Sequence, residues 1–258
     1  MDGVTLKAPT GRITGLIGPN GAGKTTIFNV CSGLTRPSEG RVSLDSANII
    51  RSGPAARARR GLGRTYQQFE LCDSLTVREN VAMGMEGRYA NQNPLNHLVG
   101  SRRTALRIAA ATAEALAICD LSALADRTVG SMSTGQRRLV ELARCLAGPY
   151  RILLLDEPSS GLDRAETARF GEILREVVDS RGLGVLLVEQ DMALVTEICG
   201  HIYVLDFGKL IFEGSVPDMM ASPIVQSAYL GTAAVEEIQA VQGAAALGEN
   251  ADPQDVRA

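Results

Sequence analysis

Residues 18–26, with the sequence GPNGAGKTT, have the residue types and spacing of a phosphate-binding loop. Gly18, Gly23, Lys24 and Thr25 occupy the fixed positions of the pattern G-x-x-x-x-G-K-[ST]. Glycines let backbone N–H groups approach phosphate oxygens, and the N-terminus of a following helix adds partial positive charge. An ordinary glycine turn is disfavoured, because a chance match is expected in roughly one chain in a hundred of this length. The predicted phosphate contacts are Gly18, Pro19, Asn20, Gly21, Ala22, Gly23, Lys24, Thr25 and Thr26.

Two adjacent carboxylates supply the second candidate for chemistry. Asp156 and Glu157 follow the apolar residues Leu153–Leu155. By itself this arrangement often marks only the end of a strand, but a phosphate-loop enzyme needs such a pair beside its loop. Asp156 and the Thr25 hydroxyl would then hold Mg²⁺, and Glu157 would orient or deprotonate an attacking water. The sequence therefore predicts binding and hydrolysis of a nucleotide with Mg²⁺.

The elements that must position these residues follow from hydrophobic patterning. Arg12–Ile17 is predicted as a strand leading into the loop, and a helix is predicted from Thr25 to Ser32. The continuous apolar runs at 151–155 and 184–188 are typical of parallel strands buried on both faces. The remaining predicted elements of this part are strands at 4–6, 41–44, 201–205 and 210–213 and a helix at 165–180. The five arginines of 51–64 are predicted to lie on a solvated helix face.

The middle of the chain has a different character. Thr76 and Glu79 have the spacing of a capping box that opens a helix, and residues 105–125 show helical spacing. Residues 91–96 form a polar break. We therefore predict an α/β core in two parts, 1–69 and 149–231, with a mostly helical subdomain at 70–148. The Ala-rich acidic tail, 232–258, is predicted to be disordered.

Bulk composition restricts the classes of protein. The chain has 258 residues and a net charge of −3, which argues against a nucleic-acid binder. No apolar run approaches a membrane span, and the first residues lack the apolar segment of a signal peptide. The five cysteines are scattered singly, so the sequence suggests neither a zinc site nor a disulfide framework and fits a reducing cytosol.

A further motif precedes the carboxylate pair. Met132-Ser133-Thr134-Gly135-Gln136 resembles the LSGGQ signature of ATP-binding cassette (ABC) ATPases, with Met for Leu and Thr for the first Gly. Considered by themselves, Ser133 and Gln136 fit a capping box. The two interpretations are compatible, because a capped helix N-terminus binds anions, and the family presents it to the γ-phosphate held by a second subunit.

Other motifs extend this resemblance over about residues 3–231. Tyr66-Gln67-Gln68 resembles the Q-loop, with Gln67 as the match, and Ser160–Asp163 resembles the D-loop, although Asp163 and Glu166 also fit a helix cap. The resemblance implies a RecA-like phosphate-loop core with a mostly parallel sheet, an inserted helical subdomain and ATPase activity. It also implies site residues: Glu157, Gln190 and Gln67 in catalysis, Thr25, Gln67 and Asp156 at Mg²⁺, and Ser133, Gly135, Gln136 and Asp163 at ATP.

Two departures from the family stand out. Gln190 occupies the place of the usual histidine; its amide can bond a phosphate but cannot relay a proton, and we predict that it is a working substitute. The sequence also has no aromatic residue before Phe28 to stack on adenine, and the family's first strand is missing. We expect the natural start to lie upstream of Met1; a chain starting here should discriminate adenine weakly and show a raised KM for ATP.

Four segments are similar to the ATPase subunits of branched-chain amino-acid importers: 61–67, the insert 86–103, 135–139 and 223–231. Urea and short-amide importers share this lineage. The implied partners are a second ATPase subunit, identical or not, transmembrane permease subunits and, indirectly, a solute-binding protein, with no nucleic acid. The implied location is the cytoplasmic side of the membrane. Phe69, Leu71 and Leu75 beside Gln67 either receive the permease or are core residues. The alternatives are a non-transport ABC ATPase and a regulatory cassette that binds ATP without hydrolysing it.

Overall fold

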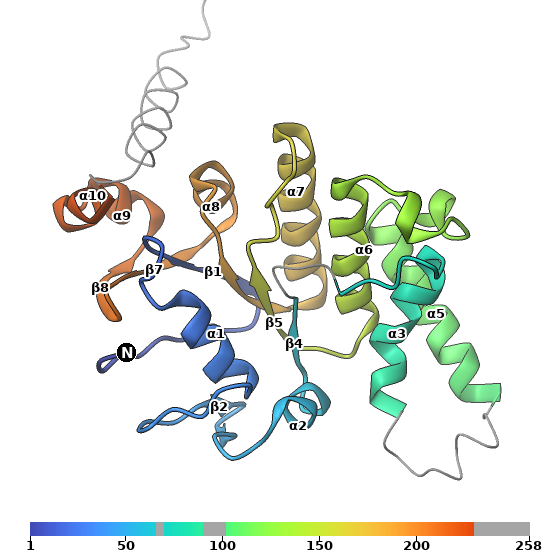
Figure 1. Cartoon of the computed structure of the whole chain (residues 1–258), viewed down its shortest axis with the longest axis horizontal. Coiled ribbons are helices and arrows are strands. Elements are labelled where there is room, and N and C mark those ends of the chain that lie inside the picture. Colours follow the sequence, from blue (N-terminus) through green and yellow to red (C-terminus); the bar gives the residue numbers. More distant parts are fainter. Residues whose placement is uncertain (66–69, 90–101, 230–258) are drawn as a thin grey trace, which may run out of the picture.

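A six-stranded sheet runs through the centre of the molecule (Figure 1). In the computed structural model, which describes residues 1–65, 70–89 and 102–229, its strand order is β4-β5-β6-β1-β7-β8. All neighbouring pairs are parallel except β7 and β8. The strands are β1 (Arg12–Ile17), β4 (Leu62–Arg64), β5 (Ile152–Asp156), β6 (Gly184–Val188), β7 (His201–Asp206) and β8 (Lys209–Gly214). The predicted mostly parallel sheet is confirmed.

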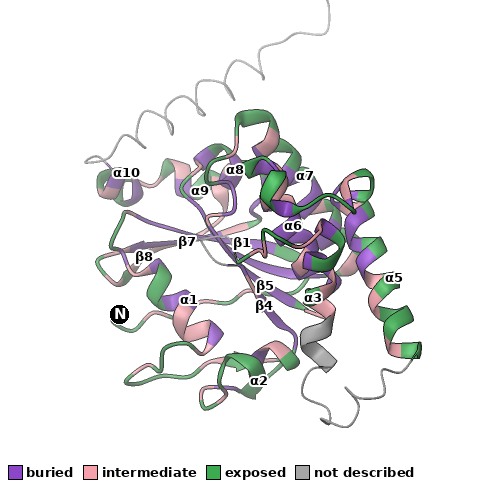
Figure 2. Cartoon of the chain, turned by 45° about the vertical axis from the view of Figure 1, so that its right-hand side comes forward, coloured by how far each residue is buried: buried purple, intermediate pink, exposed green. Residues whose placement is uncertain are grey.

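Each face of the sheet has its own hydrophobic core, because successive side chains along a strand point to opposite faces. Leu153, Leu155, Val185 and Leu187 belong to the larger core. This core includes residues of α6 (Thr134–Ala147), α7 (Arg164–Arg181) and α8 (Met192–Ile198). Leu154, Leu186 and Val188 instead pack with Ile27 and Phe28 of α1 (Lys24–Ser32). Figure 2 shows the central strands buried between these helices, which explains their continuous apolar runs.

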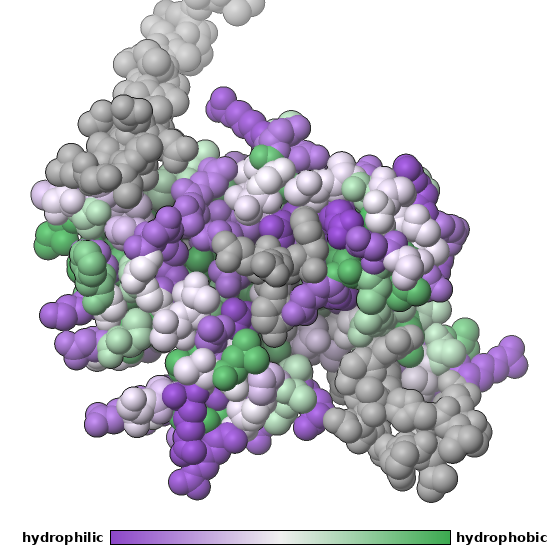
Figure 3. All heavy atoms as spheres, in the orientation of Figure 1, coloured by the Kyte–Doolittle hydropathy of each residue, from purple (hydrophilic) through white to green (hydrophobic). Residues whose placement is uncertain are grey.

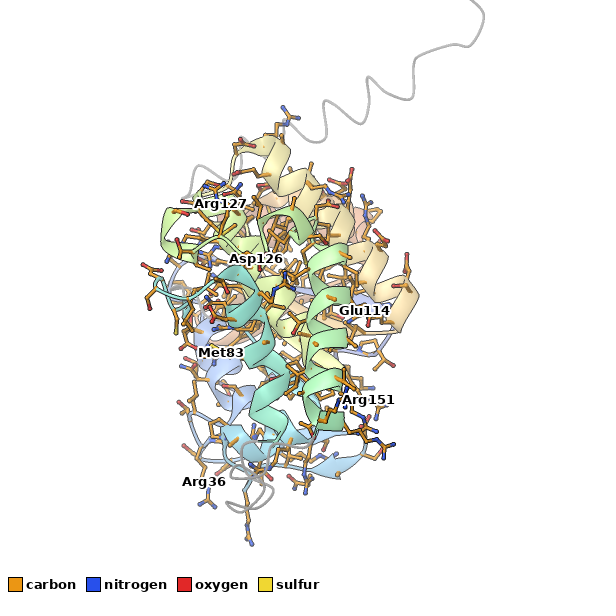
Figure 4. The ribbon with its side chains drawn as sticks, turned by 90° about the vertical axis from the view of Figure 1, so that its right-hand side faces the viewer. Arg36, Met83, Glu114, Asp126, Arg127 and Arg151 are labelled. Carbon is orange, nitrogen blue, oxygen red and sulfur yellow. The ribbon has the colours of Figure 1, made fainter. Side chains whose placement is uncertain are left out.

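The middle of the chain folds into helices that pack on one another. They are α3 (Val77–Tyr89), α5 (Arg102–Ile118) and α6, with two short 3₁₀ turns, Ser122–Leu124 and Val129–Ser131, between α5 and α6. Figure 4 shows α3, with Met83, beside α5, with Glu114. The predicted capping box of α3 is confirmed: Glu79 N donates to Thr76 Oγ1 at 3.2 Å, and Thr76 N to Glu79 Oε2 at 2.8 Å. The boundaries of a separate subdomain at residues 70 and 148 stay a prediction.

The smaller elements complete the fold and bring two corrections. They are β2 (Ser43–Leu44), β3 (Ala47–Asn48), α2 (Pro54–Arg59), α9 (Val216–Ala221) and α10 (Pro223–Tyr229). The strand expected at 41–44 is reduced to two residues of the β2–β3 hairpin. Residues 4–6 form no strand. The N–H groups on either side of them find other acceptors, since Asp2 N donates to Gly208 O and Lys7 N to the Tyr203 hydroxyl.

The predicted solvated face at 51–64 is wrong for Arg57. Its side chain is 1% exposed and donates to four carbonyl oxygens: Ser52 O at 2.8 Å, Val30 O at 2.5 Å, Cys31 O at 2.6 Å and Ile50 O at 3.4 Å. Val30 and Cys31 lie in the last turn of α1, whose carbonyl groups lack partners within the helix. Arg57 therefore closes the C-terminal end of the helix that follows the phosphate loop.

Hydrophilic and hydrophobic residues alternate over the visible part of the face in Figure 3, and long hydrophilic side chains project from its edges. Within residues 1–65, 70–89 and 102–229, no helix combines the length and apolar character needed to cross a bilayer. The expectations for residues 66–69, 91–96 and 232–258, Gln67 and Phe69 among them, lie outside the described residues.

Candidate nucleotide-binding site

The phosphate loop joins the end of β1 to the start of α1, as expected. Gly18 has a φ of 150°, and a Cβ atom there would lie 2.2 Å from Leu205 O, so only glycine fits. Gly23, the N-cap of α1, makes no side-chain cap, and the first turn has no acidic residue. By contrast, side chains cap α6, α7, α8 and α9. The first N–H groups of α1 are thus left for an external anion.

Lys24 lies over this loop. Its Nζ donates to Gly18 O at 2.6 Å and to Pro19 O at 3.0 Å, and the residue is 7% exposed. Burial lowers the pKa of Lys24, while the charges of Glu157 and Asp156 oppose that shift. The lysine is therefore electrostatically coupled to both members of the carboxylate pair.

Asp156 ends β5 next to β4. Its Oδ2 lies 3.4 Å from Arg64 Nη2, its N–H donates to Thr65 Oγ1 at 3.3 Å, and the residue is 6% exposed. Burial raises the pKa of Asp156, and the Arg64 guanidinium opposes this. In the described part of the chain, no three His, Cys, Asp or Glu residues cluster as a metal site.

Three loops meet at Gln190. Its Nε2 donates to Glu157 Oε1 at 2.6 Å and lies 3.3 Å from Asn20 Oδ1 in the phosphate loop. Glu157 has a left-handed φ of 47°, which is uncommon outside glycine, and its N–H donates to Val188 O at 2.9 Å. The structure thus brings Asn20, Glu157 and Gln190 together from the ends of β1, β5 and β6.

The residues of the signature motif, Ser133, Gly135 and Gln136, lie at the start of a helix on the other side of the sheet from the phosphate loop. α6, which Ser133 caps, covers the opposite face of the sheet from α1. Gln136 N donates to Ser133 Oγ and Ser133 N to Gln136 Oε1, both at 3.2 Å, so this predicted capping box is confirmed. A Cβ atom on Gly135 would lie 2.1 Å from Glu166 Oε1. In the described residues, no hydrogen bond or ion pair joins residues 133–136 to residues 18–26, and the neighbour of Gly135 is Glu166 at the start of α7.

Comparison with known proteins decides the family. The family model described as "ABC transporter" matches residues 1–160. The chain belongs to this family. It is 36% identical to the high-affinity branched-chain amino acid transport ATP-binding protein BraF of Pseudomonas aeruginosa, over 90% of this chain and 92% of that protein. It is 34% identical to the lipopolysaccharide export ATP-binding protein LptB of Acidithiobacillus ferridurans, over 88% and 89%.

Similarity to solved structures supports the same family assignment. The ADP conformation of MJ1267, an ATP-binding cassette of an ABC transporter, matches with a TM-score of 0.78 and 30% identity over 90% of this chain and 92% of that chain. The dimeric post-hydrolysis state of the cassette MJ0796, bound to ADP and Pi, matches with a TM-score of 0.69 and 25% identity over 83% and 89%. This chain is therefore an ATP-binding ABC cassette and an ATPase.

The remaining expected site residues of the cassette are placed as follows. Asp163 caps α7: its Oδ1 accepts Glu166 N at 2.8 Å, and its own N–H donates to Glu166 Oε2 at 3.1 Å. Sequence reasoning missed Arg64, which it grouped with the solvated arginines, and Glu189, whose side chain is buried behind Gln190. The position of Arg64 at the end of the short strand β4 was the signal available for it.

Proposed function

We propose that this cassette hydrolyses ATP at a site built on the phosphate loop, Asp156, Glu157 and Gln190, and thereby powers solute import. The hydrogen bond from Gln190 to Glu157 carries the proposal. It places an amide donor beside the carboxylate best placed to activate water, at the mouth of the phosphate loop.

The roles follow from these positions. The uncapped N-terminus of α1 and Lys24 bind the phosphates, and Glu157 orients or deprotonates the attacking water. Gln190, which cannot carry a proton to the reaction, holds Glu157 and offers its amide to the γ-phosphate. Thr25 and Asp156, with Gln67 by resemblance, would hold Mg²⁺, which neutralises charge on the phosphates.

We further propose that each site is completed by a second subunit, identical or not. Ser133, Gly135 and Gln136 at the start of α6, and Asp163 at the start of α7, belong to helices that pack on the other face of the sheet from α1 and its phosphate loop. The capped start of α6 is nevertheless an anion-binding element. The dimeric form of the similar cassette MJ0796 supports this arrangement. ATP would then favour the closed dimer, and hydrolysis would release it.

The transport partners are assigned by similarity. Transmembrane permease subunits would place the cassette at the cytoplasmic side of the membrane, and a solute-binding protein would act indirectly. Leu71 and Leu75, both half-buried, follow the Gln67 segment in the sequence, and we assign them to a docking surface for the permease. Branched-chain amino acids or related small solutes are favoured, because the match covers 92% of BraF but 63% of the methionine import protein MetN of Pasteurella multocida. Uptake of labelled leucine, methionine and urea by a deletion strain tests the solute.

Glu157→Gln tests the hydrolytic role. The amide keeps the shape of the side chain but cannot accept a proton from water, so turnover should fall by about 10²-fold or more. The variant should still bind ATP and should accumulate as an ATP-bound dimer in gel filtration. Glu197→Gln, at an exposed residue of α8, is the control. Turnover that stays at the wild-type rate in Glu157→Gln would show that Glu157 does not activate the water. ATP binding without turnover in the wild type and in the variant alike would identify a regulatory cassette.

A further inference from the structure

Glu189 is a buried carboxylate without a role in the proposed reaction. It directly follows β6 and is 2% exposed. Its Oε1 accepts Ser159 N at 2.8 Å, and its Oε2 accepts Gln190 N at 3.0 Å and Asp191 N at 3.4 Å. A buried carboxylate is costly unless it is well bonded, and backbone N–H groups from two separate loops supply these bonds.

The two loops are the ones that carry Glu157 and Gln190. Ser159 lies two residues after Glu157, and Gln190 is the neighbour of Glu189 itself. The side chains of Glu157 and Gln190 meet at 2.6 Å on the exposed side, while Glu189 fastens the backbones behind them. Asp191 then caps α8, its Oδ1 accepting Leu194 N at 3.0 Å, which fixes the far end of the second loop.

We propose that Glu189 is a positioning residue that sets the contact between Gln190 and Glu157. This inference rests on the proposed function. The role requires a group that only accepts hydrogen bonds. Both oxygens of Glu189 face N–H donors, so a glutamine there would turn an NH₂ group toward one of them. The isosteric variant Glu189→Gln therefore loosens one or both loops while changing the volume of the side chain very little.

A double-mutant cycle separates positioning from general stabilisation. We expect Glu189→Gln to lower kcat at saturating ATP by about tenfold, with a smaller change in KM, because the variant leaves Lys24 and the loop amides untouched. In a Gln190→Ala background, the same change should lower kcat by less than about twofold, since the contact it sets is already gone. Glu197→Gln in both backgrounds is the control. Equal losses in the two backgrounds would overturn the proposal.

Hydrogen exchange supplies a readout independent of ATP hydrolysis. Without nucleotide, the amides of Ser159, Gln190 and Asp191 should exchange faster in Glu189→Gln than in the wild type, with those of β6 unchanged. If Glu189→Gln does not fold, Glu189→Asp, which keeps the charge but shortens its reach, should show the same pattern. Unchanged exchange at these amides overturns the proposal even in an active enzyme. A wild type without ATPase activity would refute the proposed function and leave this test intact.

Discussion

At the scale of single residues, Gln190 illustrates how one side chain positions others at the candidate site. One amide group reaches acceptors on two different loops, Glu157 Oε1 and Asn20 Oδ1. A neutral side chain of this kind holds its partner without changing charge over the working pH range. In the proposed reaction, the proton of the attacking water would pass to Glu157 or to the phosphate, because an amide such as Gln190 cannot take it.

Gln190→Ala should lower kcat by about 10- to 100-fold. Hydrogen bonds to charged groups contribute about 1.5–3 kcal/mol, and the substitution removes the bond that orients Glu157. Steady-state phosphate release measures the effect. Gln226→Ala, which loses only a bond to Met220 O near α10, should retain wild-type activity. Turnover near wild type in Gln190→Ala would show that the glutamine does not replace the family's histidine.

At the scale of elements, close approach of α3 and α6 fixes the helical part of the chain. A Cβ atom on Gly84 of α3 would lie 1.9 Å from Arg144 O of α6. The same principle acts at Gly135, where α6 touches Glu166 at the start of α7. Gly84 and Gly135 thus allow α6 to pack closely against α3 on one side and against the start of α7 on the other. The signature residues lie at the start of the same helix.

Gly84→Ala should destabilise the protein by about 1–3 kcal/mol, because the added methyl group forces the backbones of α3 and α6 apart. Chemical unfolding followed by circular dichroism measures the change. Gly53→Ala is the matched control, since no atom lies within 4 Å of a Cβ there and its φ of −73° suits alanine. Equal stability of the two variants would show that the helices adjust freely.

The sequence predicted five of the six strands of the central sheet, all but β4, and the three capping boxes at Thr76, Ser133 and Asp163, because these depend on residues adjacent in the chain. The predictions were wrong or incomplete where the surroundings of a residue depend on residues far away in the chain. Arg57 has the same local surroundings as exposed Arg59, and only the end of α1, reached through folding, makes it a buried group. Glu189 likewise depends on Ser159, thirty residues earlier. The phosphate loop and carboxylate pair were predicted, but the hydrogen bonds that join Asn20, Glu157 and Gln190 could not be.

At the scale of the whole molecule, the phosphate loop and the signature belong to opposite faces of one sheet. Under the proposed dimer arrangement, a monomer would hold two different halves of the ATP site. When two copies associate as proposed, each half meets its complement on the other copy, so two sites form by one symmetry operation.

Mixing two inactive variants tests this arrangement. Lys24→Ala removes the phosphate-binding charge, and Ser133→Arg blocks the signature, so each homodimer should lose activity. A mixture should regain part of the wild-type rate, because the mixed dimer has one site with both halves intact. Phosphate release after mixing measures it. If the chain pairs only with a different subunit, or if each site is complete within one chain, mixing restores nothing.

The uncapped N-terminus of α1 has a thermodynamic consequence. Side chains cap the N-termini of α6, α7 and α8, whereas the N-cap of α1, Gly23, offers none and leaves that position open to the proposed phosphate group. ATP is then part of the folded structure as well as its substrate, and the bound form should unfold at a higher temperature. At an ATP concentration of 100 times Kd, the gain is about 2.7 kcal/mol. Calorimetry with ATP should show this rise, and Lys24→Ala should lose most of it at the same concentration. The cassette would be least stable between turnovers, when one nucleotide has left and the next has not arrived.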